Sequence, residues 1–211
     1  MADEKHYPGR SVVVTFNARR CLHTGECVHS LPAVFDPAQR PWIMPDEGGA
    51  AEIERAVALC PTGALASRRT DGTPAEDHTG GNLAVVSANG PLYLRGHIEL
   101  NRLDGVVEHI RAAALCRCGA SSNRPFCDGN HRRAPFKAEG LPGHRSVGPV
   151  PGNGVLKITF REHGPMLLSG NWLLRTADGE ETCEGGALCR CGASKRKPWC
   201  DGSHRTCGFQ D

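Results

Sequence analysis

An internal repeat is the feature that most limits how this chain of 211 residues can fold. The segment Gly90–His97 recurs, with substitutions, as Gly164–Asn171. Each copy is followed by the run Leu-Cys-Arg-Cys-Gly-Ala-Ser, which begins at Leu115 in the first copy and at Leu188 in the second. Each copy then ends in Cys-Asp-Gly-x-His. The chain therefore contains two copies of one small unit, and its fold must be built from them.

Each copy carries three cysteines and one histidine in its motif. The two sets are Cys116, Cys118, Cys127 and His131 in the first copy, and Cys189, Cys191, Cys200 and His204 in the second. Three thiolates and one imidazole make four ligands, which suffice for a binuclear iron–sulfur cluster or for one tetrahedral zinc ion. We therefore predict one metal centre in each copy.

The spacing within each set favours iron over zinc. Structural zinc sites usually have two to four residues between paired cysteines, whereas a single residue separates Cys116 from Cys118. We expect these two side chains to diverge, which suits a lone zinc ion poorly, and to hold one iron of a cluster that presents two metals. The Cys and His on either side of Asp-Gly would hold the other iron. A zinc-stapled binding module is the alternative.

The pattern Cys-x-Cys-x2-Ser-x3-Pro-x-Cys-Asp-Gly-x-His, with Ser121 and Ser194 at its serine position, resembles the mitoNEET-like CDGSH iron–sulfur domain family over roughly residues 82–211. This resemblance implies a [2Fe–2S] cluster on each of the two ligand sets. It also implies that the tandem copies correspond to the family's homodimer fused into one chain. We therefore expect a monomer with an intramolecular pseudo-two-fold axis.

The first copy departs from this motif at one position. Asn130 stands where the family has the serine before the ligating histidine. Asn can keep a hydrogen bond to the cluster shell, so we expect the cluster to be retained with a shifted reduction potential.

A second group of cysteines lies near the N-terminus. Bacterial ferredoxins bind a cluster through Cys-x2-Cys-x2-Cys together with a remote Cys-Pro. Cys21 and Cys27 occupy the first and third positions of this pattern, and Thr24 replaces the second cysteine. Cys60, which precedes Pro61, supplies the remote Cys-Pro. The segment resembles a divergent single-cluster ferredoxin over roughly residues 10–70.

Three cysteines in such a domain imply a [3Fe–4S] cluster, or a [4Fe–4S] cluster with one foreign ligand. The candidates for that ligand are His23, His29 and a solvent oxygen. A ferredoxin-like fold that holds no cluster and serves in docking is the alternative.

The predicted fold class is α+β, with a small ferredoxin-like N-terminal domain and a pseudo-two-fold pair of small, β-rich CDGSH domains. The predicted boundaries are 1–70 for the ferredoxin-like domain, 71–81 for a polar linker, 82–140 for the first CDGSH domain and 141–211 for the second. Apolar patterning predicts strands over Ser11–Asn17, Asn82–Ser87, Leu92–Leu94, Val155–Phe160 and Met166–Leu168. Helical spacing predicts a helix over Glu47–Leu59, and a short helical turn is expected over Ala112–Leu115.

Composition excludes several classes of function. A net charge of +2 gives no reason to expect a nucleic acid or a membrane surface as partner. The N-terminal segment lacks the apolar run of a signal peptide, so we expect a cytoplasmic, reducing location. In such a compartment the eleven cysteines are more often metal ligands than disulfides.

We interpret the chain as a redox protein that transfers single electrons through its clusters, and not as an enzyme. The sequence has no nucleotide-binding loop and no Gly-x-Ser-x-Gly elbow, and Asp128 and Asp201, each followed by Gly, are expected to cap turns. The alternative functions are cluster storage or transfer, and redox or pH sensing through the histidine ligands. The expected partners are redox proteins or apo-proteins that accept a cluster.

Overall fold

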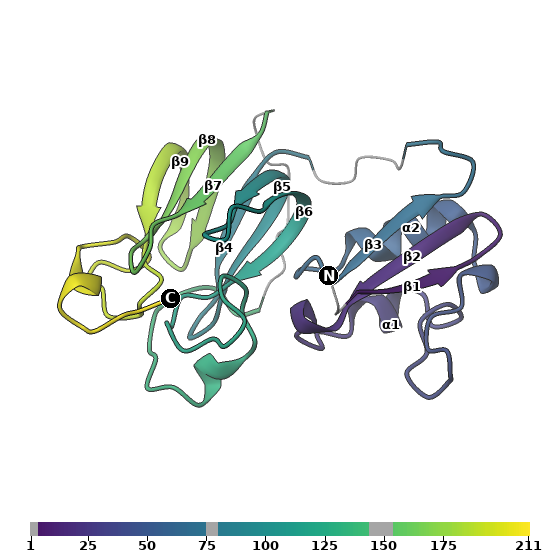
Figure 1. The fold of residues 1–211 in the computed structure, drawn as a ribbon, viewed down its shortest axis with the longest axis horizontal. Helices are drawn as coiled ribbons and strands as arrows, with labels where there is room; N and C mark the ends of the chain where they lie inside the picture. Colours follow the sequence, from purple (N-terminus) through teal and green to yellow (C-terminus); the bar gives the residue numbers. More distant parts are fainter. Residues whose placement is uncertain (1–3, 75–79, 144–153) are drawn as a thin grey trace. The chain divides into compact units, whose positions relative to one another are not determined.

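The computed structural model describes residues 4–74, 80–143 and 154–211. The chain divides into two compact units, Met1–His78 and Thr79–Asp211 (Figure 1). Residues 75–79 of the predicted linker lie outside the described residues. No helix in the described ranges combines the length and the apolar character that crossing a membrane requires.

The N-terminal unit is built on a three-stranded antiparallel sheet in the order β1-β2-β3. These strands are β1 (Glu4–Pro8), β2 (Val12–Asn17) and β3 (Leu65–Arg69). The middle strand, β2, turns its alternate side chains Val12 and Val14 into the interior, where both are fully buried. The strand predicted over Ser11–Asn17 is confirmed.

Two helices complete this unit, α1 (Glu26–Ser30) and α2 (Ala50–Ala58). α2 places Ile53 and Val57 in one apolar core with Phe35 and the two buried valines of β2. The helix predicted over Glu47–Leu59 is confirmed with a later start. The Gly49 amide donates a hydrogen bond of 3.0 Å to Glu52 Oε2, which satisfies one of the amides left unpaired at a helix N-terminus.

The second unit holds both sequence repeats in one six-stranded sheet. Its strands are β4 (Leu83–Val86), β5 (Leu92–Asn101), β6 (Val107–Leu115), β7 (Leu156–Phe160), β8 (Met166–Thr176) and β9 (Gly179–Leu188). Each repeat contributes one short strand and one long antiparallel hairpin, β5–β6 in the first repeat and β8–β9 in the second (Figure 1).

The short strands tie the two repeats together. β4 pairs antiparallel with β5 of its own repeat and parallel with β8 of the other. In the same way β7 pairs antiparallel with β8 and parallel with β5. Apolar side chains of both repeats, including Leu94 and Leu100 of β5 and Leu168 and Trp172 of β8, then fill a single core. Neither repeat has a core of its own.

The structure extends some predicted strands and corrects one prediction. The strands over Asn82–Ser87 and Val155–Phe160 are confirmed as β4 and β7, and those at Leu92–Leu94 and Met166–Leu168 are the first residues of the longer β5 and β8. The helical turn expected over Ala112–Leu115 is wrong, because these residues end strand β6.

The alanines of this segment favour a helix by intrinsic propensity. Here Ala113 lies opposite Leu94 of β5 and is fully buried, so pairing and burial in the sheet outweigh that local preference. Strands predominate over helices in the described residues, which is compatible with the small β-rich domains that the sequence predicts.

Candidate metal centres

The two motif loops follow directly from the hairpins. β6 ends at Leu115, and the chain folds back so that the Cys116 amide donates to the Pro125 carbonyl at 2.9 Å and the Cys127 amide donates to the Ala114 carbonyl at 2.8 Å. The second repeat has the same two bonds: Cys189 to Pro198 and Cys200 to Ala187, both 2.8 Å. The end of each hairpin therefore positions the first and third cysteines of its loop.

The four predicted ligands of each site form two close pairs. Cys116 Sγ lies 3.7 Å from Cys118 Sγ, and Cys127 Sγ lies 3.3 Å from His131 Nδ1. The second site repeats this arrangement, with 3.6 Å between Cys189 Sγ and Cys191 Sγ and 3.3 Å between Cys200 Sγ and His204 Nδ1. The thiols of each Cys-x-Cys segment converge, so the expectation that they diverge is wrong.

These distances fit a site for two metals. Two thiolates at about 2.3 Å from one tetrahedral metal are about 3.8 Å apart, and a thiolate and an imidazole nitrogen on one metal are about 3.5 Å apart. Each pair therefore matches the ligands of one metal. Within the described ranges, no three His, Cys, Asp or Glu side chains gather closely enough to hold a single metal ion. The residues fit a binuclear iron–sulfur cluster, with one pair for each iron.

The aspartate of each Cys-Asp-Gly segment braces its loop, as expected. Asp128 Oδ2 accepts hydrogen bonds of 2.8 Å from both the amide and the hydroxyl of Ser122, and its Oδ1 accepts one from the Asn130 amide at 3.0 Å. Asp201 accepts the corresponding bonds from the Lys195 and Ser203 amides. Burial opposes ionisation of Asp128, but these hydrogen bonds outweigh it and hold its pKa below the usual value. Both residues cap turns.

Asn130 keeps the hydrogen bonding that a serine would supply. Its side-chain amide donates to Asp128 Oδ2 at 3.0 Å and also reaches the Ala120 carbonyl at 3.1 Å. The side chain of Ser203, at the same position in the second repeat, donates one described hydrogen bond, from its hydroxyl to Asp201 Oδ1 at 2.6 Å. The Asn130 side chain therefore adds a second hydrogen bond across the first loop, to the Ala120 carbonyl.

The thiols of the first site differ in how readily they ionise. A hydrogen bond from Cys118 lowers the pKa of Cys116 to about 6, although burial works against it. The same contact raises the pKa of Cys118, which keeps the shared proton. Burial raises the pKa of Cys127 to about 11 and that of Cys191 in the second site to about 12. Because metals bind thiolates, loading of either site must release protons.

The two sites touch along the backbone. Cys118 and Cys191 form an isolated antiparallel bridge, so one predicted ligand of each site lies beside one predicted ligand of the other. Glycine follows each of them: a Cβ on Gly119 would lie 2.9 Å from the Cys191 carbonyl oxygen, and a Cβ on Gly192 would lie 2.9 Å from the Cys118 carbonyl oxygen. The close approach of the two loops requires glycine at both positions.

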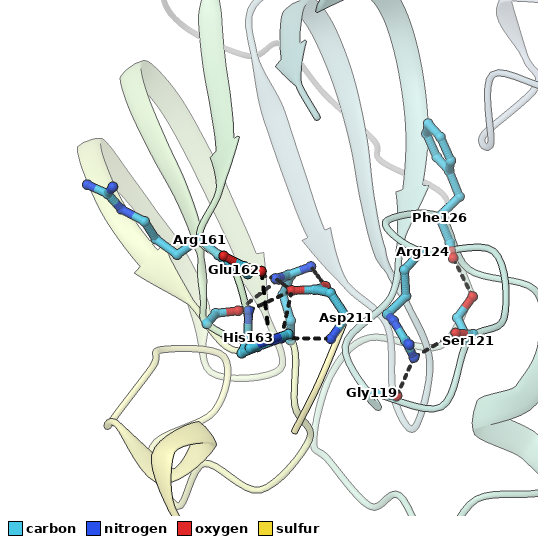
Figure 2. A network of polar contacts seen from close by, with 10 residues as sticks. Gly119, Ser121, Arg124, Phe126, Arg161, Glu162, His163 and Asp211 are labelled. Carbon is cyan, nitrogen blue, oxygen red and sulfur yellow. Dashed lines mark hydrogen bonds and ion pairs between the residues drawn. The ribbon is translucent and has the colours of Figure 1, made fainter. Parts of the chain in front are cut away.

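Sequence reasoning missed one residue that the structure places next to the second site. Asp211 binds Arg190, the residue between Cys189 and Cys191, through two contacts of 2.7 and 2.8 Å. Figure 2 shows Asp211 beside His163, whose amide also donates to it, at 2.7 Å. Aligning the repeats on Phe136 and Phe209 could have found this residue, because only the second repeat has an acid two positions further on.

The N-terminal cysteines also lie in one neighbourhood. Burial raises the pKa values of Cys21 and Cys27, the latter to about 11, and in both cases the nearby Cys60 raises the value further by charge repulsion. Such repulsion falls with distance, so the three cysteines lie in the same region of the unit, although their side chains are not gathered closely enough in the described residues to hold a single metal ion. His23 has a left-handed backbone conformation, with φ of 54°, and its Nδ1 lies 3.9 Å from Cys21 Sγ.

Comparison with known proteins gives two family matches. The family described as "Divergent 4Fe-4S mono-cluster" matches residues 7–70, and the family described as "Iron-binding zinc finger CDGSH type" matches residues 89–132 and 163–205. The matched ranges contain both ligand sets and the three N-terminal cysteines.

Relatives are found that match part of the chain. The uncharacterized protein YjdI of Escherichia coli strain K12 is 40% identical over 62 residues, which are 29% of this chain and 82% of that protein. The uncharacterized protein YjdI of Escherichia coli O157:H7 matches to the same extent. No solved structure matches the chain.

Proposed function

Because this chain belongs to the divergent 4Fe-4S mono-cluster family in its N-terminal part and to the CDGSH-type iron-binding family in its two repeats, we propose that it is a one-electron carrier with an iron–sulfur cluster in each repeat. The observation that carries this proposal is the arrangement of each ligand set as two pairs, each spaced for one metal. In this proposal each repeat holds a [2Fe–2S] cluster, which undergoes one-electron redox chemistry when bound.

The residues around each site favour electron uptake. A neutral imidazole replaces one thiolate, so each site is less negative than one with four cysteines, and imidazole ligation raises the potential of related clusters. Backbone amides add to this effect: Ala120 donates to Cys118 Sγ and Ala193 donates to Cys191 Sγ, both at 3.4 Å. Hydrogen bonds to cluster thiolates are among the factors that set the potential.

The contact between the sites supports electron exchange between them. Cys118 and Cys191, proposed ligands of different sites, are paired along the backbone. The reciprocal pairing of β4 with β8 and of β7 with β5 supports a pseudo-two-fold relation of the repeats, with Cys118 and Cys191 at its centre. An electron delivered to either site would then have a short path to the other within one compact unit.

We further propose a third cluster in the N-terminal unit, held by Cys21, Cys27 and Cys60. The placement of these cysteines in one region supports it, and His23 is the candidate fourth ligand for a [4Fe–4S] cluster, because its Nδ1 lies close to Cys21 Sγ. Without this ligand, three cysteines would hold a [3Fe–4S] cluster. This unit would be the second redox element of the carrier.

The proposed partners are redox proteins that dock beside the repeats. Exposed cations follow or precede the histidine ligands, including Arg132 and Arg133 in the first repeat and Lys195, Arg196 and Arg205 in the second. Such a surface favours a partner with acidic side chains around its own redox centre.

The test begins with metal analysis of protein purified without oxygen. About four irons and four sulfides per chain would correspond to two filled repeats, and about seven or eight of each would add the third cluster. Reduction of the sample, followed by electron paramagnetic resonance, should then show reversible uptake of one electron per cluster. Zinc without sulfide, or sites that no mild reductant reduces, would refute the proposal.

Cluster transfer is the second candidate function. The histidine ligands His131 and His204 are only half-buried, so solvent can reach the pair that each forms with its cysteine. Incubation with an apo-ferredoxin at neutral pH separates the two functions. Prompt movement of iron and sulfide into the acceptor would favour transfer, whereas full retention during repeated reduction and oxidation would favour electron transfer.

A further inference from the structure

The arginine between the first two cysteines of each motif lies in the same backbone frame in both repeats. Arg117 Nε donates to the Gly90 carbonyl at 3.0 Å and its Nη2 donates to the Ser87 carbonyl at 2.6 Å. Arg190 makes the same contacts in the second repeat, with Gly164 at 2.8 Å and Arg161 at 2.7 Å. Each arginine is only 3% exposed. Each site thus has a buried cation beside two of its ligands.

The repeats differ in what neutralises that cation. Arg190 forms a two-bond ion pair with Asp211, whose side chain is 15% exposed. At the corresponding position the first repeat has Ala138, and within the described part of the chain no acidic side chain pairs with Arg117. The frame around this position is otherwise shared: Asn89 and His163 both have φ of 49°, and their side chains accept from the Ala138 and Asp211 amides.

The Asp211 carboxylate is ionised at neutral pH. Burial opposes this, but the hydrogen bonds from Arg190 and from the His163 amide lower its pKa below the ordinary value, and the charges of Arg190 and of Arg124, which lies in the first repeat's loop, lower it further. The charge of Arg190 is therefore matched by a negative charge at hydrogen-bond distance. Arg117 has the same kind of surroundings, carbonyl oxygens and a ring, that of Phe136, 5.5 Å from its guanidinium carbon. It differs in its opposite charges, which come from the thiols of Cys189, Cys118 and Cys116 and not from a carboxylate.

A buried charge acts on a nearby cluster with little screening by solvent. Reduction adds one electron, so an unneutralised cation stabilises the reduced state and raises the potential. An ion pair has no net charge and therefore raises the reduction potential far less. We propose that the ion pair of Asp211 with Arg190 sets the reduction potential of the second repeat's site below that of the first. An electron that enters either of the two sites would then reside first at the first site, beside Arg117. This inference rests on the electron-transfer function proposed above.

Surface cations do not reverse this order. Lys195 and Arg196 lie near the second site, and Arg132 and Arg133 lie near the first, but all four are exposed. Water and salt screen such charges, whereas they screen a buried guanidinium much less. The ion pair of Asp211 with Arg190 is thus the main difference in buried charge between the two sites, whereas Lys195 and Arg196, which replace Ser122 and Asn123, add only exposed charge.

The experiment is a potentiometric titration of the full-length, cluster-loaded protein, followed by electron paramagnetic resonance. His131→Cys and His204→Cys, each of which exchanges an imidazole for a thiolate, assign the two steps to their repeats. Asp211→Asn should raise the lower potential more than the higher one, because Asp211 binds Arg190 directly and lies only within charge range of Arg124 in the first loop. Ala138→Asp, which offers Arg117 the missing partner, should lower the higher potential. Asp178→Asn removes the same charge at an exposed turn and should change neither.

The possible results are distinguishable. If the two reduction potentials of the wild type approach each other in Asp211→Asn, the inference is supported. Inversion of their order in the double variant with both Asp211→Asn and Ala138→Asp would strengthen it. If Asp211→Asn loses its clusters, Ala138→Asp decides, because it adds a charge without removing a contact. If the difference between the two reduction potentials is the same in the wild type and in both variants, this inference alone is overturned. A wild-type protein with no reversible one-electron step would instead overturn the proposed function.

Discussion

Replacing Gly119 by alanine tests the contact between the two ligand loops. Gly119 has φ of 75°, a left-handed conformation that costs an ordinary L-residue roughly 1–2 kcal/mol. The new Cβ would also lie 2.9 Å from the Cys191 carbonyl oxygen, a backbone atom that cannot turn away. Overpacking of this kind costs about 1–3 kcal/mol. We therefore expect the free energy of unfolding of the second unit to fall by about 2–5 kcal/mol.

Gly105→Ala is the matched control. Gly105 has φ of 81°, in the turn between β5 and β6, but no atom lies within 4 Å of where its Cβ would be. It incurs the conformational cost without the clash. The extra cost in Gly119→Ala is about 1–3 kcal/mol, which corresponds to a melting temperature roughly 2–12 °C below that of Gly105→Ala. Circular dichroism and visible absorbance of the cluster-loaded protein, recorded in the same thermal scan, measure both unfolding and cluster loss.

The new Cβ belongs to the first repeat and clashes with a backbone atom of the second, so we expect the substitution to affect both repeats. Gly119→Ala pushes on Cys191, a predicted ligand of the second site, and we expect both sites to lose metal together. Gly192→Ala should behave alike, because its Cβ would lie 2.9 Å from the Cys118 carbonyl oxygen. Equal melting of the Gly119 and Gly105 variants, or loss of metal from the first site alone, would refute this reasoning.

Three further predictions concern single side chains. Arg69→Ala removes a two-bond ion pair, with contacts of 2.7 and 2.8 Å, from the buried carboxylate of Glu54; urea denaturation should show a loss of about 3 kcal/mol in the N-terminal unit, against under about 0.5 kcal/mol for the exposed Arg68→Ala. Asp211 has a lowered pKa, so its ion pair is fully formed above about pH 4 and is lost as the pH falls through that lowered value. The difference in melting temperature between wild type and Asp211→Asn should thus be present at pH 7 and shrink in strong acid, and a constant difference would contradict it. His23→Ala should convert a [4Fe–4S] signal into a [3Fe–4S] signal and lower the iron content by about one per chain; an unchanged spectrum would exclude His23 as the ligand.

The pairing of the candidate ligands could be approached from sequence because their arrangement is local. The three cysteines and the histidine of each set lie within one loop, and the loop's own hydrogen bonds, such as those to Asp128 and Asp201, bring them into pairs. Residue type and spacing therefore carried most of the information. The direction of the side chains could not be predicted from the local sequence. The thiols of Cys116 and Cys118 converge because of how the chain folds back after the hairpin.

The exchange of strands between the repeats could not be predicted in this way. A local pattern marks β4 as a strand, but its second partner, β8, lies far along the chain and leaves no trace in that pattern. Strand β6 was missed for a related reason, since its alanines favour a helix until β5 pairs with them. The role of Asp211 likewise became visible only when the fold placed it on Arg190.

The exchange of strands leads to a last prediction, that the first repeat alone, residues 82–140, does not fold as a monomer. In the full chain, β5 pairs through Ile98–Asn101 with β7 of the second repeat, and β4 pairs with β8. A single repeat leaves both edges open and loses the apolar residues Leu156, Ile158 and Leu168 that complete its core. Unpaired edges of this kind associate with another copy.

Two copies of the segment can satisfy each other, because β4 of each can take the place that β7 occupies beside β5. We therefore expect a homodimer of residues 82–140 whose helix-poor circular dichroism and metal binding appear together as its concentration rises. Light scattering coupled to size-exclusion chromatography measures the mass. A folded, metal-loaded monomer at low concentration would show that the edges of β4 and β5 do not need a partner. Each repeat would then fold by itself, and the shared core would form only because the two repeats are joined in one chain.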